Sequence, residues 1–462
     1  MNRKTKNMKV GFSARILSLS ALLGSMLWMG ATQEALAQRL ITMETAVREA
    51  QDNNLQIKQA AFQASLSEQD LKQARMSFYP TLNLGASGNK SWGLSFDQTA
   101  GRLVTQSVTS SGLRLSSGVD LFQGFQRINQ VRANKYSLMA SESEVERAKN
   151  DLTLSVITTY LDALTNLDLY QASQQQLTLS KEQLRVLEIN LEAGNNTMAD
   201  LYQAETQVAT DELNVTTSQN AYEMALLNLK QLMEMAPEVE IELERPSVEQ
   251  VQVNTNRMMA RDIFSSAVVS FPEIKTAEFN TLSAERQIAI AKGGLYPSLS
   301  LSAGIGTNYS SQARDFNSQQ ILPFGDQFER NRNESIGLSL NIPIFNQGRT
   351  RIGINRAKIA YQNALTNEQL VKNNLNKVIH QAVLDLNSAE KQLAAAETAL
   401  ASATQTFEVI QLRFDEGMAN SVELSTSQIA MNRAEFEFIQ SKYNFIFRSK
   451  VIDFYLGQPT WF

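Results

Sequence analysis

The chain has 462 residues, with 42 lysines and arginines against 47 aspartates and glutamates, a net charge of −5 at neutral pH, and no cysteine. An acidic chain whose only basic cluster is N-terminal lacks the electrostatic footprint of a nucleic-acid-binding protein. The absence of cysteine excludes disulfide bonds and a lipid-modified N-terminal cysteine.

Residues 1–37 have the three parts of a secretory signal peptide. A basic segment ending at Arg15 is followed by an apolar run from Ile16 to about Met29, and then by Ala35-Leu36-Ala37. We expect cleavage before Gln38; the alternative, an uncleaved N-terminal helix, is disfavoured because the apolar run is short. No later run approaches the ~18 apolar residues of a membrane helix, so the mature chain could cross a membrane only with strands.

Two long tracts contain no proline, since none of the eight prolines lies between residues 81 and 236 or between 344 and 458. Proline breaks helix interiors, and both tracts have apolar residues at helical spacing, so they predict very long helices. We expect long helices over about 125–193 and 348–416, and returning helices over about 197–234 and 420–457. Each long helix would reach roughly 105 Å, a length typical of coiled coils.

The two tracts belong to an internal duplication. The segment GFQRINQVRA at 124–133 matches GRTRIGINRA at 348–357, and LEAGNNTMADL at 191–201 matches FDEGMANSVEL at 414–424. The dipeptide Tyr-Pro opens an alternating segment in each half. We therefore expect a first repeat over residues 38–234, a connector over 235–271, and a second repeat over 272–462. An opening helix is expected in each repeat, at about 43–77 and 273–293.

Each repeat contains a predicted strand hairpin, over about 81–122 and 298–345. Apolar residues alternate with Ser, Gly and Asn, and in the first strand the alternation continues to Phe96. Aromatic residues lie near the strand ends: Tyr79, Trp92, Phe122, Tyr296 and Phe345. This pattern is typical of transmembrane β-strands, although a soluble sheet with one buried face alternates in the same way. Four strands cannot close a barrel, so copies of the chain would share one, with eight strands from two copies or twelve from three.

These features resemble the TolC-like outer membrane efflux proteins. The similarity extends over residues 38–457 and rests on ITMETAVREAQDNNLQIKQA at 41–60, the Tyr-Pro strands, the FQG and FNQG helix starts, and the paired glycine turns. The resemblance implies an α+β homotrimer in which a 12-stranded β-barrel continues into a 12-helix α-barrel. It also implies a place in the outer membrane of a Gram-negative bacterium, with the tunnel reaching into the periplasm.

The same resemblance implies an exit duct for small molecules or proteins, joined to an inner-membrane pump by a periplasmic adaptor. The glycine turns at Gly194 and Gly417 would form the tunnel entrance and contact the adaptor. Glu423 would line the entrance and favour cations, with Asp200 as its counterpart in the first repeat. Thr426 stands where the family often has a second acid. The alternative for Asp200 and Glu423 is that they only stabilise helix N-termini.

In related proteins of the family, polar links between neighbouring hairpins hold the tunnel entrance shut. At the linking positions this chain has Phe414 and Ala419, and neither side chain is suited to that role.

The only histidine, His380, lies within a predicted helix, and we identify no catalytic, metal-binding or cofactor-binding motif. We therefore do not expect an enzyme. The competing function is a periplasmic coiled-coil adaptor or structural protein without a pore.

Overall fold

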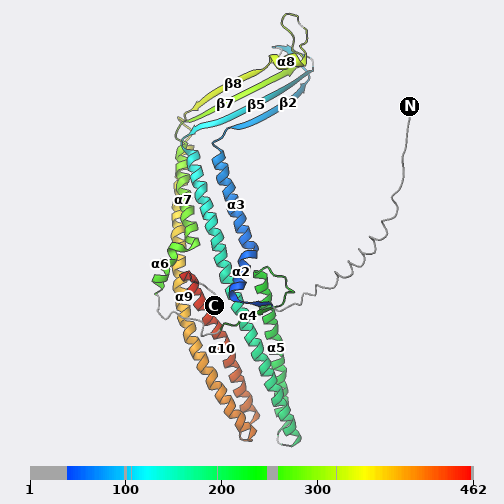
Figure 1. Ribbon diagram of the computed structural model, residues 1–462, viewed down its shortest axis with the longest axis vertical. Coiled ribbons are helices and arrows are strands. Elements are labelled where there is room, and N and C mark those ends of the chain that lie inside the picture. Colours follow the sequence, from blue (N-terminus) through cyan, green and yellow to red (C-terminus); the bar gives the residue numbers. More distant parts are fainter. Residues whose placement is uncertain are drawn as a thin grey trace, which may run out of the picture.

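A computed structural model of the chain describes residues 39–97, 101–105, 107–194, 196–246, 259–318 and 320–458. The predicted signal peptide lies outside these residues. The molecule is long and narrow, with a four-stranded sheet at one end and two helical hairpins at the other (Figure 1). In the described part of the chain, no helix is both long and apolar enough to cross a membrane.

The sheet takes one hairpin from each half of the chain. Its strand order is β2 (Thr81–Ser91), β5 (Val108–Gln123), β7 (Ser298–Ser310) and β8 (Asn333–Asn341), and all neighbours are antiparallel. Strands β2 and β8 are the two edges. The register aligns Leu84 with Leu115 and Leu115 with Ile305, so leucines and isoleucines share one face while the polar residues share the other.

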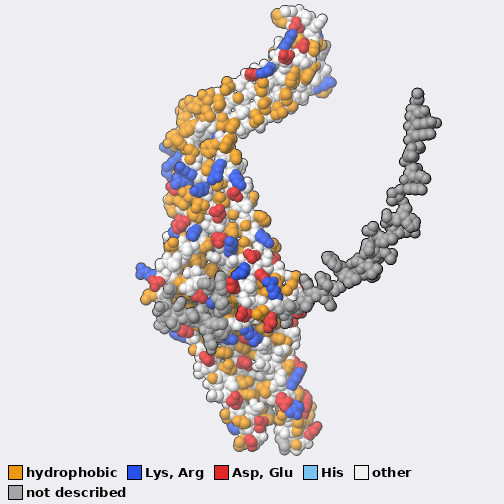
Figure 2. All heavy atoms as spheres, viewed as in Figure 1, with side chains coloured by type: hydrophobic (Ala, Val, Ile, Leu, Met, Phe, Trp, Pro, Cys, Tyr) orange, Lys and Arg blue, Asp and Glu red, His pale blue; other side chains and the backbone are white. Residues whose placement is uncertain are grey.

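The apolar face of this sheet is exposed to solvent in the single chain. Ile336 is 79 % exposed and Leu82 is 71 % exposed, and hydrophobic side chains cover much of the sheet in Figure 2. A contiguous apolar surface of this kind marks an interface with lipid or protein.

The strands are shorter than the alternation predicted. β2 ends at Ser91, because Gly93 adopts a φ of +105° and turns the chain. Phe96 therefore belongs to a separate small hairpin of β3 (Ser95–Asp97) and β4 (Arg102–Val104). The loop after β7 contains a short helix, α8 (Phe324–Arg330), that the sequence did not indicate.

Two long helices lead away from the sheet. α4 (Gln126–Glu192) and α9 (Arg349–Asp415) each have 67 residues, which corresponds to about 100 Å. Each is followed by a returning helix, α5 (Met198–Leu232) or α10 (Ser421–Leu456). Closer to the sheet, α3 (Leu55–Met76) packs on α4, and α7 (Pro272–Gly293) packs on both α4 and α9.

The junction between sheet and helices depends on a close backbone approach. Gly124 precedes α4 with a φ of +59°, and a Cβ there would lie only 2.2 Å from the carbonyl oxygen of Gly293. No side chain fits this space, so the turn from β5 into α4 requires glycine.

The opening helix predicted over 43–77 is in fact two helices, α2 (Met43–Asn53) and α3. The break is at Asn54, whose extended backbone ends α2 and whose side chain accepts a hydrogen bond from Gln56 N at 2.8 Å. Its amide nitrogen also donates to Leu232 O at 3.2 Å, which ties the break to the end of α5. The connector is more regular than expected, since it contains β6 (Ile241–Leu243) and α6 (Ala260–Ser270).

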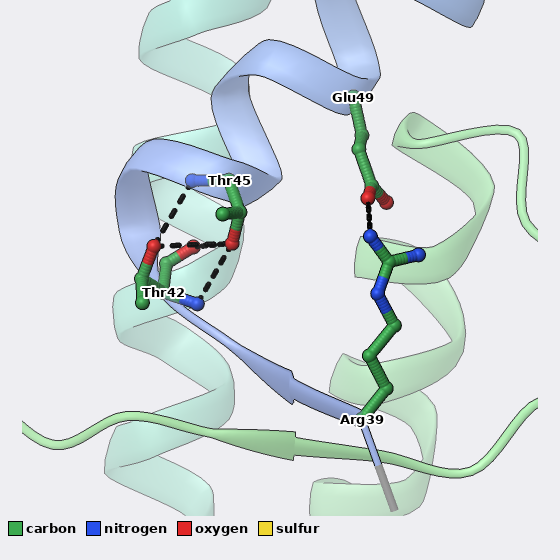
Figure 3. Close-up of polar contacts among 4 residues, drawn as sticks. All are labelled: Arg39, Thr42, Thr45 and Glu49. Carbon is green, nitrogen blue, oxygen red and sulfur yellow. Dashed lines mark hydrogen bonds and ion pairs between the residues drawn. The ribbon is translucent and has the colours of Figure 1, made fainter.

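The largest hydrophobic core lies midway along the helices, where β1 (Arg39–Ile41) pairs in parallel with β6. The buried Tyr160 hydroxyl lies 2.9 Å from Ile41 O and 2.8 Å from Glu244 O, so α4 holds the ends of both strands. Directly after β1, Thr42 and Thr45 form a reciprocal capping box at the start of α2, and Arg39 pairs with Glu49 (Figure 3). The first described residues are therefore fixed to the middle of the helical stalk.

Candidate functional site

The candidate site is at the tips of the two helical hairpins, the end of the molecule farthest from the sheet (Figure 1). Both tips have the same construction. α4 ends before Gly194 (φ +78°) and α9 ends before Gly417 (φ +70°), so each chain reversal uses the left-handed conformation that glycine adopts readily. The two predicted turn glycines thus have the backbone geometry that a tight turn requires.

The returning helices also begin in the same way. Thr197 caps α5 and exchanges hydrogen bonds with Asp200, whose Oδ2 accepts from Thr197 N at 3.0 Å. Asn420 caps α10, and its side-chain oxygen accepts from Glu423 N at 2.9 Å. Asp200 and Glu423 are therefore both at the third position of a helix, where the macrodipole favours an acid.

Asp200 has a second role that the helix cap does not require. Its Oδ1 accepts a hydrogen bond from the Ser421 hydroxyl, which belongs to the first residue of α10. The pKa of Asp200 is lowered from its ordinary value, first because of this bond and then because of the bonds from Thr197. The contact joins the hairpin of one repeat to that of the other within a single chain.

Glu423 lies in a different environment. Its carboxylate is about half exposed and its one ion-pair partner among the described residues is Arg413, at 3.9 Å between Nη2 and Oε2. Arg413 also donates to Met418 O at 3.0 Å, which braces the turn around Gly417. A surface ion pair of this length contributes little to stability, and the Glu423 carboxylate stays accessible to solvent. Thr426 lies on the same helix, three residues later, and is exposed.

A cavity of about 90 Å³ lies between the two hairpins, directly behind the Asp200–Ser421 contact. Its lining includes Leu187, Ser425 and Gln428 as well as that pair. Gln428 is only 1 % exposed, and its Nε2 has no hydrogen-bond partner in the described structure. Loose packing of this kind permits the two hairpins to move relative to each other more easily than a filled core would.

Farther from the tip, the hairpin of α4 and α5 contains a buried acid. Asp211 is 2 % exposed and accepts hydrogen bonds from Ser180 and from Gln207 Nε2, the latter at 3.1 Å. Gln176 Nε2 lies 3.4 Å from the same carboxylate. Donors on both helices thus satisfy the buried Asp211 side chain and link α4 to α5.

The predicted interface aromatics lie at the two ends of the sheet. Phe122 and Tyr296 are both next to Phe125, with ring centroids 5.2 and 6.3 Å away, at the junction with the helices. Tyr79 precedes β2 at the same end, and Phe345, after β8, is 84 % exposed. Trp92 directly follows the other end of β2, with the Lys90 ammonium 5.7 Å from its ring.

Sequence reasoning missed two residues of this site and one residue at the junction of the sheet with the helices. Ser421 and Arg413 were not singled out, although both flank the predicted turn, because Ser and Arg are common beside helix ends. Phe125 was missed because a left-handed aromatic residue, here with a φ of +64°, has no sequence signal. Among the described residues, the side-chain hydrogen bond between the hairpin tips comes from Ser421 and not from Phe414 or Ala419.

The sequence pattern of one family matches two long segments of the chain, residues 46–233 and 263–458, under the description outer membrane efflux protein. The chain belongs to this family. Among its relatives, the cation efflux system protein CusC of Escherichia coli K12 is 23 % identical over 384 residues, which is 83 % of this chain and 79 % of CusC. The outer membrane efflux protein BepC of Brucella suis is 20 % identical over 426 residues, which is 91 % of this chain and 86 % of BepC.

Solved structures have the same fold at low identity. A crystal structure of CusC superimposes with a TM-score of 0.74 at 19 % identity, covering 90 % of this chain and 92 % of that one. The open state of the MtrE channel of Neisseria gonorrhoeae gives a TM-score of 0.72 at 16 % identity, with coverages of 90 % and 89 %. This efflux protein is therefore an exit duct of the Gram-negative outer membrane, and it reaches into the periplasm.

Proposed function

We propose that three copies of this efflux protein form one closed 12-stranded β-barrel that continues into a tube of twelve helices, and that cargo leaves the cell through this conduit. The single observation that carries the proposal is the four-stranded sheet with two unpaired edges and an exposed apolar face. In lipid each unpaired backbone group costs several kcal/mol, so free β2 and β8 edges have to pair with another chain.

The strand order makes such pairing straightforward. The four strands alternate in direction, so β8 of one copy runs antiparallel to β2 of the next, and repeated pairing produces an all-antiparallel ring. The geometry of one chain is compatible with several ring sizes. The number three comes from the family resemblance, and it gives a bore that is wide enough to carry solutes.

The helices fit the same symmetry. Near the sheet each chain contributes α3, α4, α7 and α9, and near the tips it contributes α4, α5, α9 and α10. Three copies therefore supply twelve helices at either level. We propose the divisions 1–37, 38–234, 235–271 and 272–462 for signal, first repeat, connector and second repeat.

The hairpin tips would form the periplasmic entrance. In a threefold assembly Glu423 would occur three times around the axis, with Asp200 and Thr426 nearby, and the negative charge would favour cations at the entrance. The turns at Gly194 and Gly417 would contact a periplasmic adaptor, which connects the duct to an inner-membrane pump. The proposed cargo is small molecules or proteins.

The aromatic residues at the two ends of the sheet would lie at the two surfaces of the outer membrane. Tyr79, Phe122, Tyr296 and Phe345 would mark the periplasmic surface, and Trp92 the outer surface. Aromatic side chains are enriched at such interfaces because they combine an apolar ring with a polar edge or tip.

The first experiment is a mass measurement on the particle extracted from outer membranes with detergent. We expect three times the mass of the mature chain. A monomer, or a protein found only in the soluble periplasmic fraction, would overturn the shared barrel and support an adaptor without a pore.

A further inference from the structure

The polar face of the sheet, which would line the proposed barrel, contains one charge without an opposite charge beside it. All residues of β2, β5, β7 and β8 are described, and they include four charged residues: Lys90, Arg114, Asp120 and Glu334. Alternation along the strands puts Lys90 and Glu334 on the apolar face, and Arg114 and Asp120 on the polar face.

Asp120, in contrast, has an oppositely charged partner within the chain. Its Oδ2 lies 2.5 Å from Arg127 Nη2, and Gln123 Nε2 donates to the same oxygen at 2.7 Å. Asp120 lies at the end of β5 close to the helices, six residues from Arg114, or about 20 Å along the strand. The acid is therefore too distant to pair with Arg114.

The surroundings of Arg114 are small and uncharged. In the sheet register Arg114 lies between Gly85 on β2 and Gly306 on β7, and Gly306 in turn pairs with Asn333 on β8. A Cβ at Gly306 would lie 3.7 Å from the Arg114 Cβ, and a Cβ at Gly304 would lie 3.8 Å from its Nη2. The guanidinium thus extends across glycine backbone, and the side chain is exposed.

We propose that Arg114 gives the barrel lumen a fixed positive charge, which selects for anionic solutes in this part of the conduit. This inference rests on the proposed trimer, because the threefold axis repeats Arg114 as a ring of three positive charges on an otherwise neutral polar wall. Rings of arginine or lysine favour anions in other pores by the same electrostatics. The anions that this charge recognises are small carboxylates, phosphates and sulfonates.

The strength of the anion selectivity that Arg114 produces depends on ionic strength. The Debye length is about 30 Å at 10 mM salt, which exceeds the radius expected for a 12-stranded bore, and about 3 Å at 1 M. The ring should therefore influence the whole cross-section in dilute salt and almost none of it in concentrated salt. A selectivity that is strong at 10 mM and absent at 1 M is the expected signature.

The experiment is a reversal-potential measurement in planar bilayers under a KCl gradient, with the purified full-length assembly. We expect Arg114→Gln to raise the ratio of potassium to chloride permeability at least ~3-fold in dilute salt, and Arg114→Glu to raise it further, whereas Arg114→Lys leaves it unchanged. Arg48→Gln is the matched control, because it removes the same charge from an exposed helix site in the stalk.

The cysteine-free chain permits a second test on a channel that has already folded. Arg114→Cys can be modified with a positively charged or a negatively charged methanethiosulfonate reagent. The first should restore the wild-type selectivity and the second should reverse it. Leu115→Cys, the next residue along the strand, lies on the apolar face and should respond to neither reagent.

The outcomes separate the two proposals. Wild-type protein that forms no channels overturns the proposed conduit and this inference with it. Wild-type channels whose selectivity is the same in Arg114→Gln, and unchanged by both reagents at Arg114→Cys, leave the conduit intact and overturn the role of Arg114.

Discussion

Replacing Ser421 by alanine removes the one side-chain hydrogen bond found between the hairpin tips of the two repeats in the described structure. Asp200 keeps its bonds to Thr197, so the N-terminus of α5 remains capped. A hydrogen bond to a charged group contributes roughly 1.5–3 kcal/mol, and because both partners are only partly buried we take the lower limit. We propose that opening of the entrance separates the two hairpins and breaks this bond, so that about 1.5 kcal/mol corresponds to close to tenfold in the ratio of closed to open tips for each chain.

The assay is single-channel recording of the purified protein, with the closed fraction as the readout. Ser421→Ala should be open far more often than the wild type. Two controls separate the bond from a general loss of packing. Ser425→Ala removes a hydroxyl that lines the same cavity without contacting Asp200, and Ser421→Thr keeps the hydroxyl. The reasoning is refuted if Ser421→Ala has the same closed fraction as the wild type, or if Ser425→Ala opens as often as Ser421→Ala.

The same contact predicts a response to acid. The pKa of Asp200 is lowered in the folded protein. The stabilisation of the closed tips by the Asp200 carboxylate is therefore fully present above the ordinary pKa of 3.8, and it is lost as the pH falls through the lower, folded pKa. Channels should therefore stay closed near pH 7 and open more often below about pH 4. Asp200→Asn, which keeps a side-chain acceptor for the helix cap, should remove this pH dependence; a variant that still opened at the same pH would assign the response to another group.

Three further substitutions test the barrel, the hairpin core and the junction. Leu338→Arg, on the apolar face of β8, should cost ~2–4 kcal/mol in the membrane and reduce the amount of the proposed outer membrane trimer, whereas Ser339→Arg on the polar face should be tolerated. Asp211→Ala leaves buried donors unpaired, so it should destabilise the hairpin of α4 and α5 by ~1–3 kcal/mol and speed its amide hydrogen exchange. Gly124→Ala should prevent assembly, because its Cβ would lie 2.2 Å from a carbonyl oxygen, whereas Gly353→Ala, in open helix, should raise the thermal midpoint.

The long helices could be predicted from the sequence because their determinants are local. The expected range of about 125–193 compares with Gln126–Glu192 for α4. The absence of proline permits a helix of this length, and the left-handed glycine at position 194 ends it. Strand alternation is local in the same sense, which is why the two faces of the sheet could be assigned.

Features that depend on distant residues could not be predicted. The break between α2 and α3 is at Asn54, where helical spacing continues on both sides, and it is stabilised by a bond to Leu232 O, 178 residues away. The pair of Asp200 and Ser421 is separated by 221 residues. A periodic pattern carries information over a window of about 11–18 residues, so it contains no information about either partner.

One substitution between the repeats accounts for the different roles of the two acids. Asp200 and Glu423 are at equivalent helix positions, and each is bonded to its own N-cap residue. Two residues before Glu423 is Ser421, which donates to Asp200; two residues before Asp200 is Met198, which has no hydrogen-bond donor in its side chain. Glu423 therefore receives no reciprocal bond from the first hairpin and stays exposed beside Arg413. The duplicated turn thus supplies one acid that joins the hairpins and one that stays exposed, and we propose that this second acid, Glu423, faces solutes at the entrance.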